Sequence, residues 1–369
     1  MSKLNIRRLT NENEDGAPYI SGISTFSSTA FFEPPKGTTA QRPENVSPGM
    51  IRFNTDSGHL EYYNGVEWTE VLVANNTLDG GARGLFGGGN TPTLVNNIEY
   101  VSISTLGNSQ DFGDLVTAST GNAGCASAVR GIFSNRSTPA GSTQIDYVTI
   151  SSTGNAQNFG TSTVTAGYRG ALSSSTRGVI GGNGTSPALL NTIDYITIAS
   201  TGNAVDFGDL INTTERPATC ASSTRGIFMG GATPTQINTI QFVTISTTGN
   251  TIDFGDLLNT TIASTGLSNS TRGIVGSMRT PAYSNIIEFI TIATTGNSQD
   301  FGDQTDNRGA SGSAASPTRG VFAGGYGIPA FRNTIDYITI LTTGNSLDFG
   351  DMSYAADQLT GCSNGHGGL

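Results

Sequence analysis

Charge is scarce in this chain of 369 residues. Only 12% of the residues are charged, about half the share usual in soluble domains, and lysine occurs only as Lys3 and Lys36. The net charge is −10, so the chain lacks the basic face that binding to a nucleic-acid backbone requires. Apolar runs near 18 residues are absent, and MSKLNIRRLT lacks the apolar segment of a signal peptide. We therefore expect no nucleic-acid partner and no membrane insertion.

Histidine and helix-like periodicity are scarce as well. The two histidines, His59 and His366, stand near opposite ends of the chain and belong to no motif of a zinc site or a catalytic triad. We expect no catalytic residue, no metal and no cofactor. Strand-forming residues and the turn residues Gly, Asn, Asp and Pro dominate, and glycine alone accounts for 50 positions. This composition predicts an all-β protein and argues against a helical or α/β enzyme.

A repeat of 47 or 48 residues organises most of the chain. One copy is STRGIFMGGATPTQINTIQFVTISTTGNTIDFGDL, residues 223–257. Its Arg-Gly pair recurs at Arg83, Arg130, Arg177, Arg225, Arg272 and Arg319. Its Asp-Phe-Gly-Asp element recurs at Asp111, Asp206, Asp253, Asp300 and Asp348, and the second repeat has Asn158 instead. A repeat of this length with several short strands is typical of a β-propeller blade.

Each copy predicts four strands, here a (218–223), b (225–231), c (239–247) and d (252–257). Gly-Asn supplies the positive φ of a tight c–d turn. The first copy begins at strand b, and the spare strand a lies at residues 359–365. We therefore expect a six-bladed kelch-like β-propeller of four-stranded blades, closed by the C-terminal strand, which removes an exposed sheet edge. An open solenoid is the alternative.

The chain before the repeats divides into two parts. Residues 1–30 are polar and without periodicity, which predicts an extended arm. Residues 31–75 contain three short alternating segments separated by turns, which predict a small β-meander. Three short strands bury too little surface to be stable alone, so we expect this module to pack on copies of itself or on a partner. The predicted propeller follows at 76–369.

The meander and the repeats resemble proteins of tailed phages. GTTAQRPENVSPGMIRFNTDSGHLEYYNGVEW resembles a module common in their virion proteins, especially tail fibres. The TRGIFMGG, NTIQFVTI and TGNTIDFGDL segments resemble kelch-type repeats in virion structural proteins of phages that infect marine cyanobacteria. The resemblance implies a structural component of the virion, assembled in the host cytoplasm. It also implies that residues 1–75 anchor the chain to other virion proteins, in a homo-oligomer for which a trimer is one possibility.

The cysteines share one position of the repeat. Cys125, Cys220 and Cys362 all fall in strand a, where the other copies have leucine or alanine. Equivalent positions in different blades lie too far apart for a disulfide. We expect three buried free thiols that act as small apolar side chains.

The repeated Arg and Asp residues predict structural ties between strands or blades, because a catalytic group is rarely needed six times. Strands b and d begin at the same end of a blade, so Arg225 and Asp253 are expected to approach each other or a neighbouring blade. Such a charge-assisted contact contributes roughly 1–3 kcal/mol where it is partly buried.

Variation between the copies concentrates in the b–c and d–a connections, which emerge on one face of a four-stranded blade. Variable loops on a rigid scaffold are where recognition usually lies. Aromatic and arginine side chains in these loops are candidate contacts with a ligand or receptor. They are Tyr168, Arg169, Arg279, Tyr283, Tyr326, Phe331 and Arg332.

These patterns favour a non-enzymatic role. The first hypothesis is a tail-fibre or adhesin-type protein that presents its variable face to a host-surface glycan or protein. A capsid or baseplate decoration protein without receptor binding is the alternative within the same class. A glycan-processing enzyme needs two carboxylates roughly 5–10 Å apart, and the variable loops hold only Glu215, Asp306 and Asp357.

Overall fold

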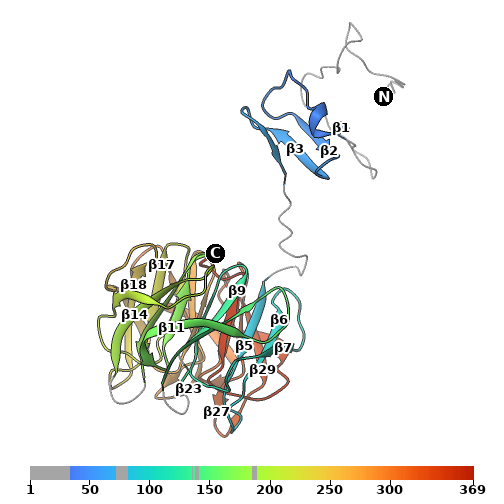
Figure 1. Ribbon diagram of the computed structural model, residues 1–369. Coiled ribbons are helices and arrows are strands. Elements are labelled where there is room, and N and C mark those ends of the chain that lie inside the picture. The colour runs from blue at the N-terminus through green and yellow to red at the C-terminus, as the bar shows by residue number, and fades with distance from the viewer. Residues whose placement is uncertain (1–33, 72–81, 135, 138–140, 185–188) are drawn as a thin grey trace, which may run out of the picture. The chain divides into compact units, whose positions relative to one another are not determined.

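The protein is built from β-strands. The computed structural model describes residues 34–71, 82–134, 136–137, 141–184 and 189–369. Within these ranges the one helix is the short 3₁₀ helix η1 (Thr39–Gln41). The chain divides into two compact units, Met1–Asn75 and Asn76–Leu369 (Figure 1). The predicted arm, 1–30, lies outside the described residues.

The described part of the first unit is a four-stranded sheet. Its strands are β1 (Lys36–Gly37), β2 (Ile51–Asn54), β3 (His59–Tyr63) and β4 (Trp68–Glu70). Strands β2, β3 and β4 form the predicted antiparallel meander, and β1 adds to it in parallel with β2. The meander is confirmed, whereas β1 was not predicted because two residues leave no periodic pattern.

The first unit buries polar side chains and exposes apolar ones. Arg52, Asn54 and Glu61 are at most 5% exposed. Glu61 accepts a 2.6 Å hydrogen bond from Arg42 and a second from Asn54, and the Arg42 bond foremost lowers the pKa of the Glu61 carboxyl. The large apolar side chains of the unit that lie at the surface are Met50, Ile51, Tyr62, Val66 and Val71. The described part of the first unit therefore has a polar interior and exposed apolar side chains.

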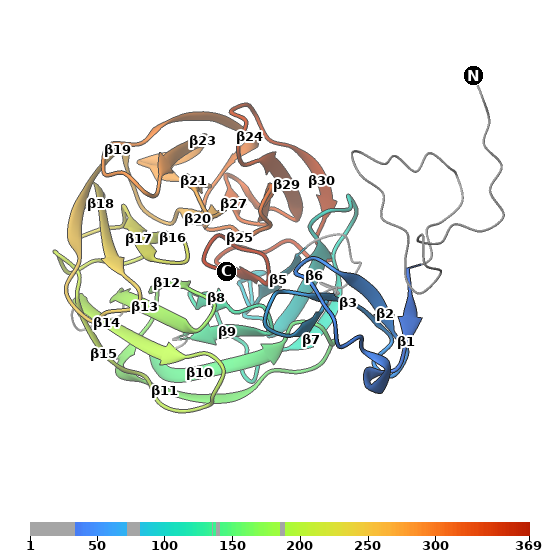
Figure 2. The same cartoon turned by 90° about the horizontal axis from the view of Figure 1, so that it is seen from above.

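The second unit contains six four-stranded antiparallel arrays, which run from the centre of Figure 2 outward. The first consists of β31 (Thr360–Ser363), β5 (Arg83–Gly87), β6 (Asn97–Ser102) and β7 (Gln110–Asp114). The second consists of β8 (Ala123–Ala126), β9 (Arg130–Ser134), β10 (Ser142–Thr149) and β11 (Gln157–Ala166). The third consists of β12 (Gly170–Ser173), β13 (Arg177–Asn183), β14 (Leu190–Thr197) and β15 (Val205–Asp209).

The remaining three follow the same order. The fourth consists of β16 (Ala218–Ala221), β17 (Arg225–Met229), β18 (Ile237–Thr244) and β19 (Ile252–Thr261). The fifth consists of β20 (Thr265–Ser268), β21 (Arg272–Gly276), β23 (Ala282–Thr291) and β24 (Gln299–Arg308), with β22 (Arg279–Thr280) also paired to β23. The sixth consists of β25 (Gly312–Ala315), β26 (Arg319–Ala323), β29 (Thr334–Thr339) and β30 (Leu347–Asp351). A separate hairpin joins β27 (Tyr326–Gly327) and β28 (Ala330–Phe331).

The predicted four strands per repeat are confirmed, and so is the pairing of the spare strand. In each sheet the strands pair in the order a, b, c and d. The C-terminal strand β31 takes the place of strand a in the first sheet, where Cys362 lies opposite Leu85. Residues nearly 280 positions apart along the chain therefore share one sheet.

The apolar core lies between neighbouring sheets rather than within one. Each of six hydrophobic clusters takes its side chains from two sheets. One cluster packs Phe86 and Ile103 of the first repeat with Val321 and Phe349 of the sixth. The same arrangement recurs between each of the remaining consecutive pairs of sheets, so each sheet is covered on both faces.

The repeated arginines connect adjacent sheets through backbone carbonyls. Each donates from Nη1 to a carbonyl oxygen of the next sheet at 2.8–3.0 Å. For example, Arg225 donates to Ile292, and Arg319 of the sixth sheet donates to Ile103 of the first. Each guanidinium also lies 4.3–4.7 Å from the ring centre of an aromatic residue in its own sheet. The predicted tie between sheets therefore exists, with a different acceptor.

Of the two alternatives expected for these residues, the structure shows the arginines in contact with a neighbouring sheet and not paired with the repeated aspartates. Asp111, Asp206, Asp253, Asp300 and Asp348 are exposed, and within the described ranges none forms an ion pair with the repeated arginines. The Asp-Phe-Gly-Asp element acts through its backbone instead. Its second Asp (Thr161 in the second repeat) donates its amide to the asparagine side chain of the next repeat's Gly-Asn turn at 3.0–3.1 Å.

The glycine of this element allows that close approach. Gly255 has φ +148°, and a Cβ there would lie 2.5 Å from the carbonyl oxygen of Gly296 in the next sheet's turn. A side chain at Gly255 would push the two sheets apart.

Strand c carries a buried polar residue that the sequence analysis overlooked. The side chains at this position are 0–7% exposed: Glu99, Asp146, Asp194, Gln241, Glu288 and Asp336. Glu288 accepts hydrogen bonds from the Leu258 amide and the Asn259 side chain of the preceding sheet, both at 2.9 Å. Gln241 accepts one from the Ile211 amide at 2.8 Å. A buried carboxylate without such partners would be costly, so these bonds fix the neighbouring sheet in place.

We predict that Arg225→Ala destabilises the protein by about 1–3 kcal/mol. The substitution removes two hydrogen bonds, to the carbonyls of Ile292 and Ala293, and the stack on Phe242. Denaturant unfolding measures the change. The matched control is Asp253→Asn, whose exposed side chain forms no ion pair with Arg225 and should shift stability by less than about 0.5 kcal/mol. Equal effects of the two variants would contradict the carbonyl tie.

Candidate functional site

The variable connections lie at one end of the sheets of the second unit, which we call the loop face. In an antiparallel order a, b, c and d, the b–c and d–a connections leave the sheet at the same end, and the a–b and c–d turns lie at the other. The seven candidate residues belong to connections of the loop face or to strands beside them. Their environments differ sharply.

Arg169 does not suit receptor contact, and this part of the prediction needs correction. It is 4% exposed, and its Nη1 lies 2.5 Å from Oδ2 of the buried Asp194. Its Nη2 donates to the carbonyls of Ile180 and Thr192. Desolvation by burial lowers the pKa of this guanidinium, although Asp194 opposes the shift. Arg169 neutralises the strand-c carboxylate of its sheet.

Three of the predicted aromatic residues form a cluster. The ring centres of Tyr283 and Tyr326 are 5.4 Å apart, and those of Tyr326 and Phe331 are 5.3 Å apart, each pair edge to face. Tyr283 comes from β23 of the fifth sheet, whereas Tyr326 and Phe331 come from the β27–β28 hairpin of the sixth repeat. All three are half-buried. Residues of two repeats thus meet as one surface, the aromatic cluster.

Two predicted arginines flank the aromatic cluster. Arg279 is exposed, lies 6.0 Å from the Tyr283 ring centre and lines a shallow groove together with Glu215 and Ile262. Arg332 donates from Nε to Asp306 at 2.6 Å. The structure therefore brings five of the seven candidates together: Arg279, Tyr283, Tyr326, Phe331 and Arg332. Tyr168 lies elsewhere, at the central cavity.

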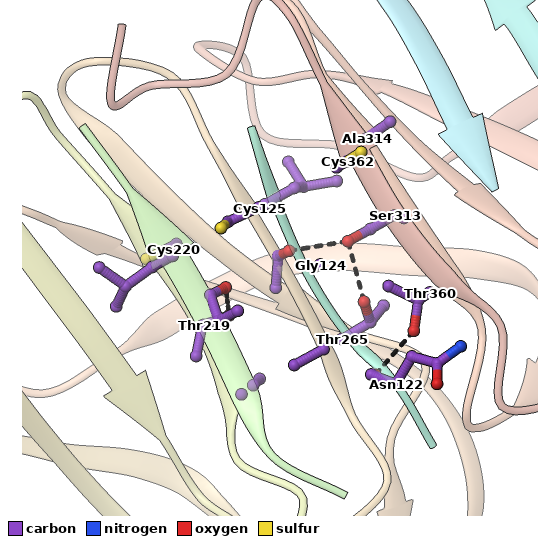
Figure 3. Close-up of a pocket in the computed structure, with 18 of the residues that line it drawn as sticks. Asn122, Gly124, Cys125, Thr219, Cys220, Thr265, Ser313, Ala314, Thr360 and Cys362 are labelled. Carbon is purple, nitrogen blue, oxygen red and sulfur yellow. Dashed lines mark hydrogen bonds between the residues drawn. The ribbon is translucent and has the colours of Figure 1, made fainter. Parts of the chain in front are cut away.

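A cavity of about 180 Å³ runs between the innermost strands (Figure 3). Its wall carries small residues and hydroxyls that bond to neighbouring sheets. Thr219 donates to the Ala171 carbonyl at 2.6 Å, Ser313 to that of Gly266 at 2.7 Å, and Thr360 to that of Asn122 at 2.7 Å. These bonds satisfy the hydroxyls and leave a polar but largely uncharged wall.

The three cysteines lie in these innermost strands, as predicted. Cys125, Cys220 and Cys362 are free, buried and 4–6% exposed. Burial raises the pKa of the Cys125 and Cys220 thiols to about 12 and raises that of Cys362 further. The prediction of free thiols acting as small apolar side chains is confirmed.

Figure 2 shows the C-terminus at the centre of the second unit. His366 of this tail lines the cavity at the end opposite the loop face, beside Ala126 at the end of β8. Nε2 of His366 donates to the Ala126 carbonyl at 2.8 Å, and its Nδ1 accepts from the Gly368 amide at 3.1 Å. Gly367 donates to the Ser268 carbonyl on another sheet at 2.9 Å. Both ring nitrogens are satisfied only in the neutral imidazole. Burial lowers the pKa of His366.

The loop-face end of the cavity is a ring with one residue from each repeat, which we call the mouth ring. Its members are Gly121, Tyr168, Arg216, Ala263, Ala310 and Gln358, all with φ between 51° and 67°. Backbone hydrogen bonds connect Tyr168 to Gly121 at 2.9 Å and Arg216 to Tyr168 at 2.8 Å. Only Tyr168 of this ring was a sequence-based candidate. The six residues share no chemical type, so no motif marks them.

No protein-family model matches the chain, and no curated protein matches it. In the part of the chain that the structure describes, no helix is long and apolar enough to cross a membrane. No cluster of His, Cys, Asp and Glu able to hold a metal ion occurs among those residues either.

We predict that the stability of the protein falls as the pH drops below the ordinary His pKa of 6.5. Because burial lowers the folded pKa, the unfolded chain takes up a proton first, so acid favours unfolding between the two pKa values. His366→Gln, which keeps a donor for the Ala126 carbonyl and does not titrate, should reduce this loss. Melting temperatures between about pH 7.5 and 5.5 test this. Parallel curves for both proteins would contradict the assignment.

Proposed function

We propose that the second unit is a six-bladed kelch-like β-propeller closed by its C-terminal strand. Two repeated patterns support this reading. Every sheet bonds to the next through the arginine and asparagine contacts, and the sixth sheet makes both of these contacts with the first, through Arg319 and Asn108. In a closed ring every sheet is covered on both faces, and one apolar cluster does join the sixth sheet to the first. An open solenoid would leave one face of each terminal sheet uncovered.

We further propose that the chain is a structural protein of a tailed-phage virion, of the tail-fibre or adhesin type, that contacts the host surface. The phage part of this proposal rests on the sequence resemblance alone. The observation that carries recognition is the aromatic cluster with its flanking arginines. Half-buried aromatic rings beside arginine on variable loops are the composition of binding hot spots. The ligand would be a glycan or protein of the host surface.

The first unit is proposed as the anchor to the particle. Its described part buries Arg52, Asn54 and Glu61 and exposes five apolar side chains, two of which lie on the sheet. Ile51 and Tyr62 lie directly opposite each other on β2 and β3, so their side chains share one face. An exposed apolar face on so small a unit favours association with further copies or with another virion protein.

Substitution in the aromatic cluster should abolish binding to host cells. The labelled full-length protein is expected to bind cultured marine cyanobacteria, and Phe331→Ala should weaken binding by about tenfold or more, because the ring anchors the cluster. The matched control is Leu341→Ala, an equally apolar side chain that is 59% exposed, after the c strand and away from the loop face. Equal binding by both variants would contradict recognition through the aromatic cluster.

Antibody labelling of intact particles separates the attachment hypothesis from its alternative. Gold at tail or fibre tips supports host contact. Gold spread over the head supports a decoration protein of the capsid, and gold at the baseplate away from the fibres supports one there. Release of oligosaccharides from host polysaccharide by the pure protein would support the enzyme hypothesis instead.

Charge on the apolar face of the first unit should dissociate an oligomer. We expect the full-length protein to be oligomeric and Ile51→Glu to be monomeric, because a charge in an apolar interface is costly. Light scattering after size exclusion measures the mass. Leu106→Glu, at a 55% exposed apolar residue of the second unit, is the control and should leave the mass unchanged. A monomeric wild-type protein would remove self-association from the proposal.

A further inference from the structure

The mouth ring holds long side chains in a backbone conformation that favours glycine. Tyr168, Arg216 and Gln358 have φ of 53°, 51° and 54°. Residues other than glycine are disfavoured there, and such outliers concentrate at functional sites. Gly121 takes the same conformation, and a Cβ on it would lie 2.5 Å from the Tyr168 ring. The glycine at one position thus makes room for the aromatic ring at the next.

Arg216 is the residue of the mouth ring whose guanidinium has a buried donor without a hydrogen-bond partner. Its guanidinium stacks on Tyr168 with 3.7 Å between the central carbon and the ring centre. Its Nε is buried without a hydrogen-bond partner, and it forms no ion pair with any described residue. Asp357 lies near enough to interact electrostatically with Arg216, but the two side chains form no ion pair. A stacked guanidinium with free donors is arranged to bind an oxyanion.

The rest of the cavity suits a polyol more than a bare ion. Ser264 Oγ lines it and is buried without a partner. Asn122, Gln358 and Tyr168 line the cavity as well. Nδ2 of Asn122 donates to Ser119 at 3.0 Å, and Oε1 of Gln358 accepts from Thr120 at 3.1 Å. The wall contains no carboxylate, and its basic residues are Arg216, Arg169 and His366. Arg169 is already paired with Asp194. Both ring nitrogens of His366 are hydrogen-bonded in the neutral imidazole. The cavity of about 180 Å³ far exceeds the roughly 10–15 Å³ that a single water needs, so it has room for a ligand much larger than a bare ion.

We propose that the mouth ring and the cavity behind it bind one acidic sugar unit of the uronic-acid class. Arg216 binds the carboxylate. Ser264, Gln358 and Asn122 bind the hydroxyls. The C-terminal tail closes the far end, so the sugar enters from the loop face. This site deepens the proposed recognition of a host-surface glycan and rests on that function for the source of the ligand, although the binding chemistry stands apart from it.

The test is calorimetric titration of the full-length protein with D-glucuronate, D-glucose and acetate. We expect glucuronate to bind about tenfold more tightly than either of the others, since glucose lacks the carboxylate and acetate lacks the hydroxyls. Arg216→Gly should weaken glucuronate binding by about 10- to 100-fold, the range of a charge-assisted hydrogen bond. It should not lower the melting temperature, because glycine relieves the positive φ. Arg136→Gln, which removes an arginine from the b–c connection of the second sheet outside the cavity, should leave binding unchanged.

Several results would overturn this inference. Equal affinity for glucose and glucuronate removes the role of Arg216, and equal affinity for acetate leaves a simple anion site. Absence of saturable glucuronate binding, or undiminished binding by Arg216→Gly, removes the site. The outcome is independent of cell binding through Phe331. If glucuronate does not bind while cells still do, only this inference fails. If glucuronate binds and cells do not, the proposed attachment fails.

Discussion

Hydrogen bonds between the outermost strand of one sheet and the turn of the next are the contacts on which the second unit depends. Around β19, the amides of Gly296 and Ser298 donate to the carbonyls of Phe254 and Asp256. The Asn297 side chain accepts from the Asp256 amide in return. An outermost strand would otherwise present unpaired amides and carbonyls to solvent. The repeated Asp-Phe-Gly-Asp and Thr-Gly-Asn elements are therefore two halves of one contact, and each copy needs its neighbour.

The scarcity of charge in the sequence follows from the same arrangement. Each sheet is covered on both faces, so few positions in the strands tolerate an ionised group. The exceptions are the buried strand-c residues, and each is satisfied by hydrogen bonds. Asp336 is 0% exposed and lies 2.7 Å from the equally buried Arg308. Removing one partner from such a pair leaves an uncompensated buried charge, which is more costly than losing an exposed pair. The buried polar contacts thus determine how each sheet is positioned against the adjacent one, while the apolar clusters supply the bulk of the stability.

The sequence patterns predicted the features that recur in every repeat. They missed the contacts that the fold makes between residues of different repeats or of different strands. The period, the four strands, the pairing of β31 and the free thiols all follow from residues that recur in register. Asp194 was overlooked because it lies in the apolar run Ile193 to Ile198, where a periodicity argument counts only the apolar positions. Arg169 was assigned to a loop surface because no sequence pattern shows that its side chain is buried against Asp194. The mouth ring was missed for a related reason, since its six residues share a backbone conformation and no chemistry.

The two ends of the second unit differ in which hydrogen-bonding groups they leave without a partner. At the turn end, His366 and Gly367 occupy backbone acceptors of two different sheets, Ala126 and Ser268. Those acceptors are used up by the chain itself. At the loop face, Arg216 Nε and Ser264 Oγ are buried without partners, and five candidate side chains meet on neighbouring connections. Unsatisfied polar groups are a cost that a fold with such regular bonding elsewhere avoids. Their concentration at the loop face therefore favours that face as the one that binds.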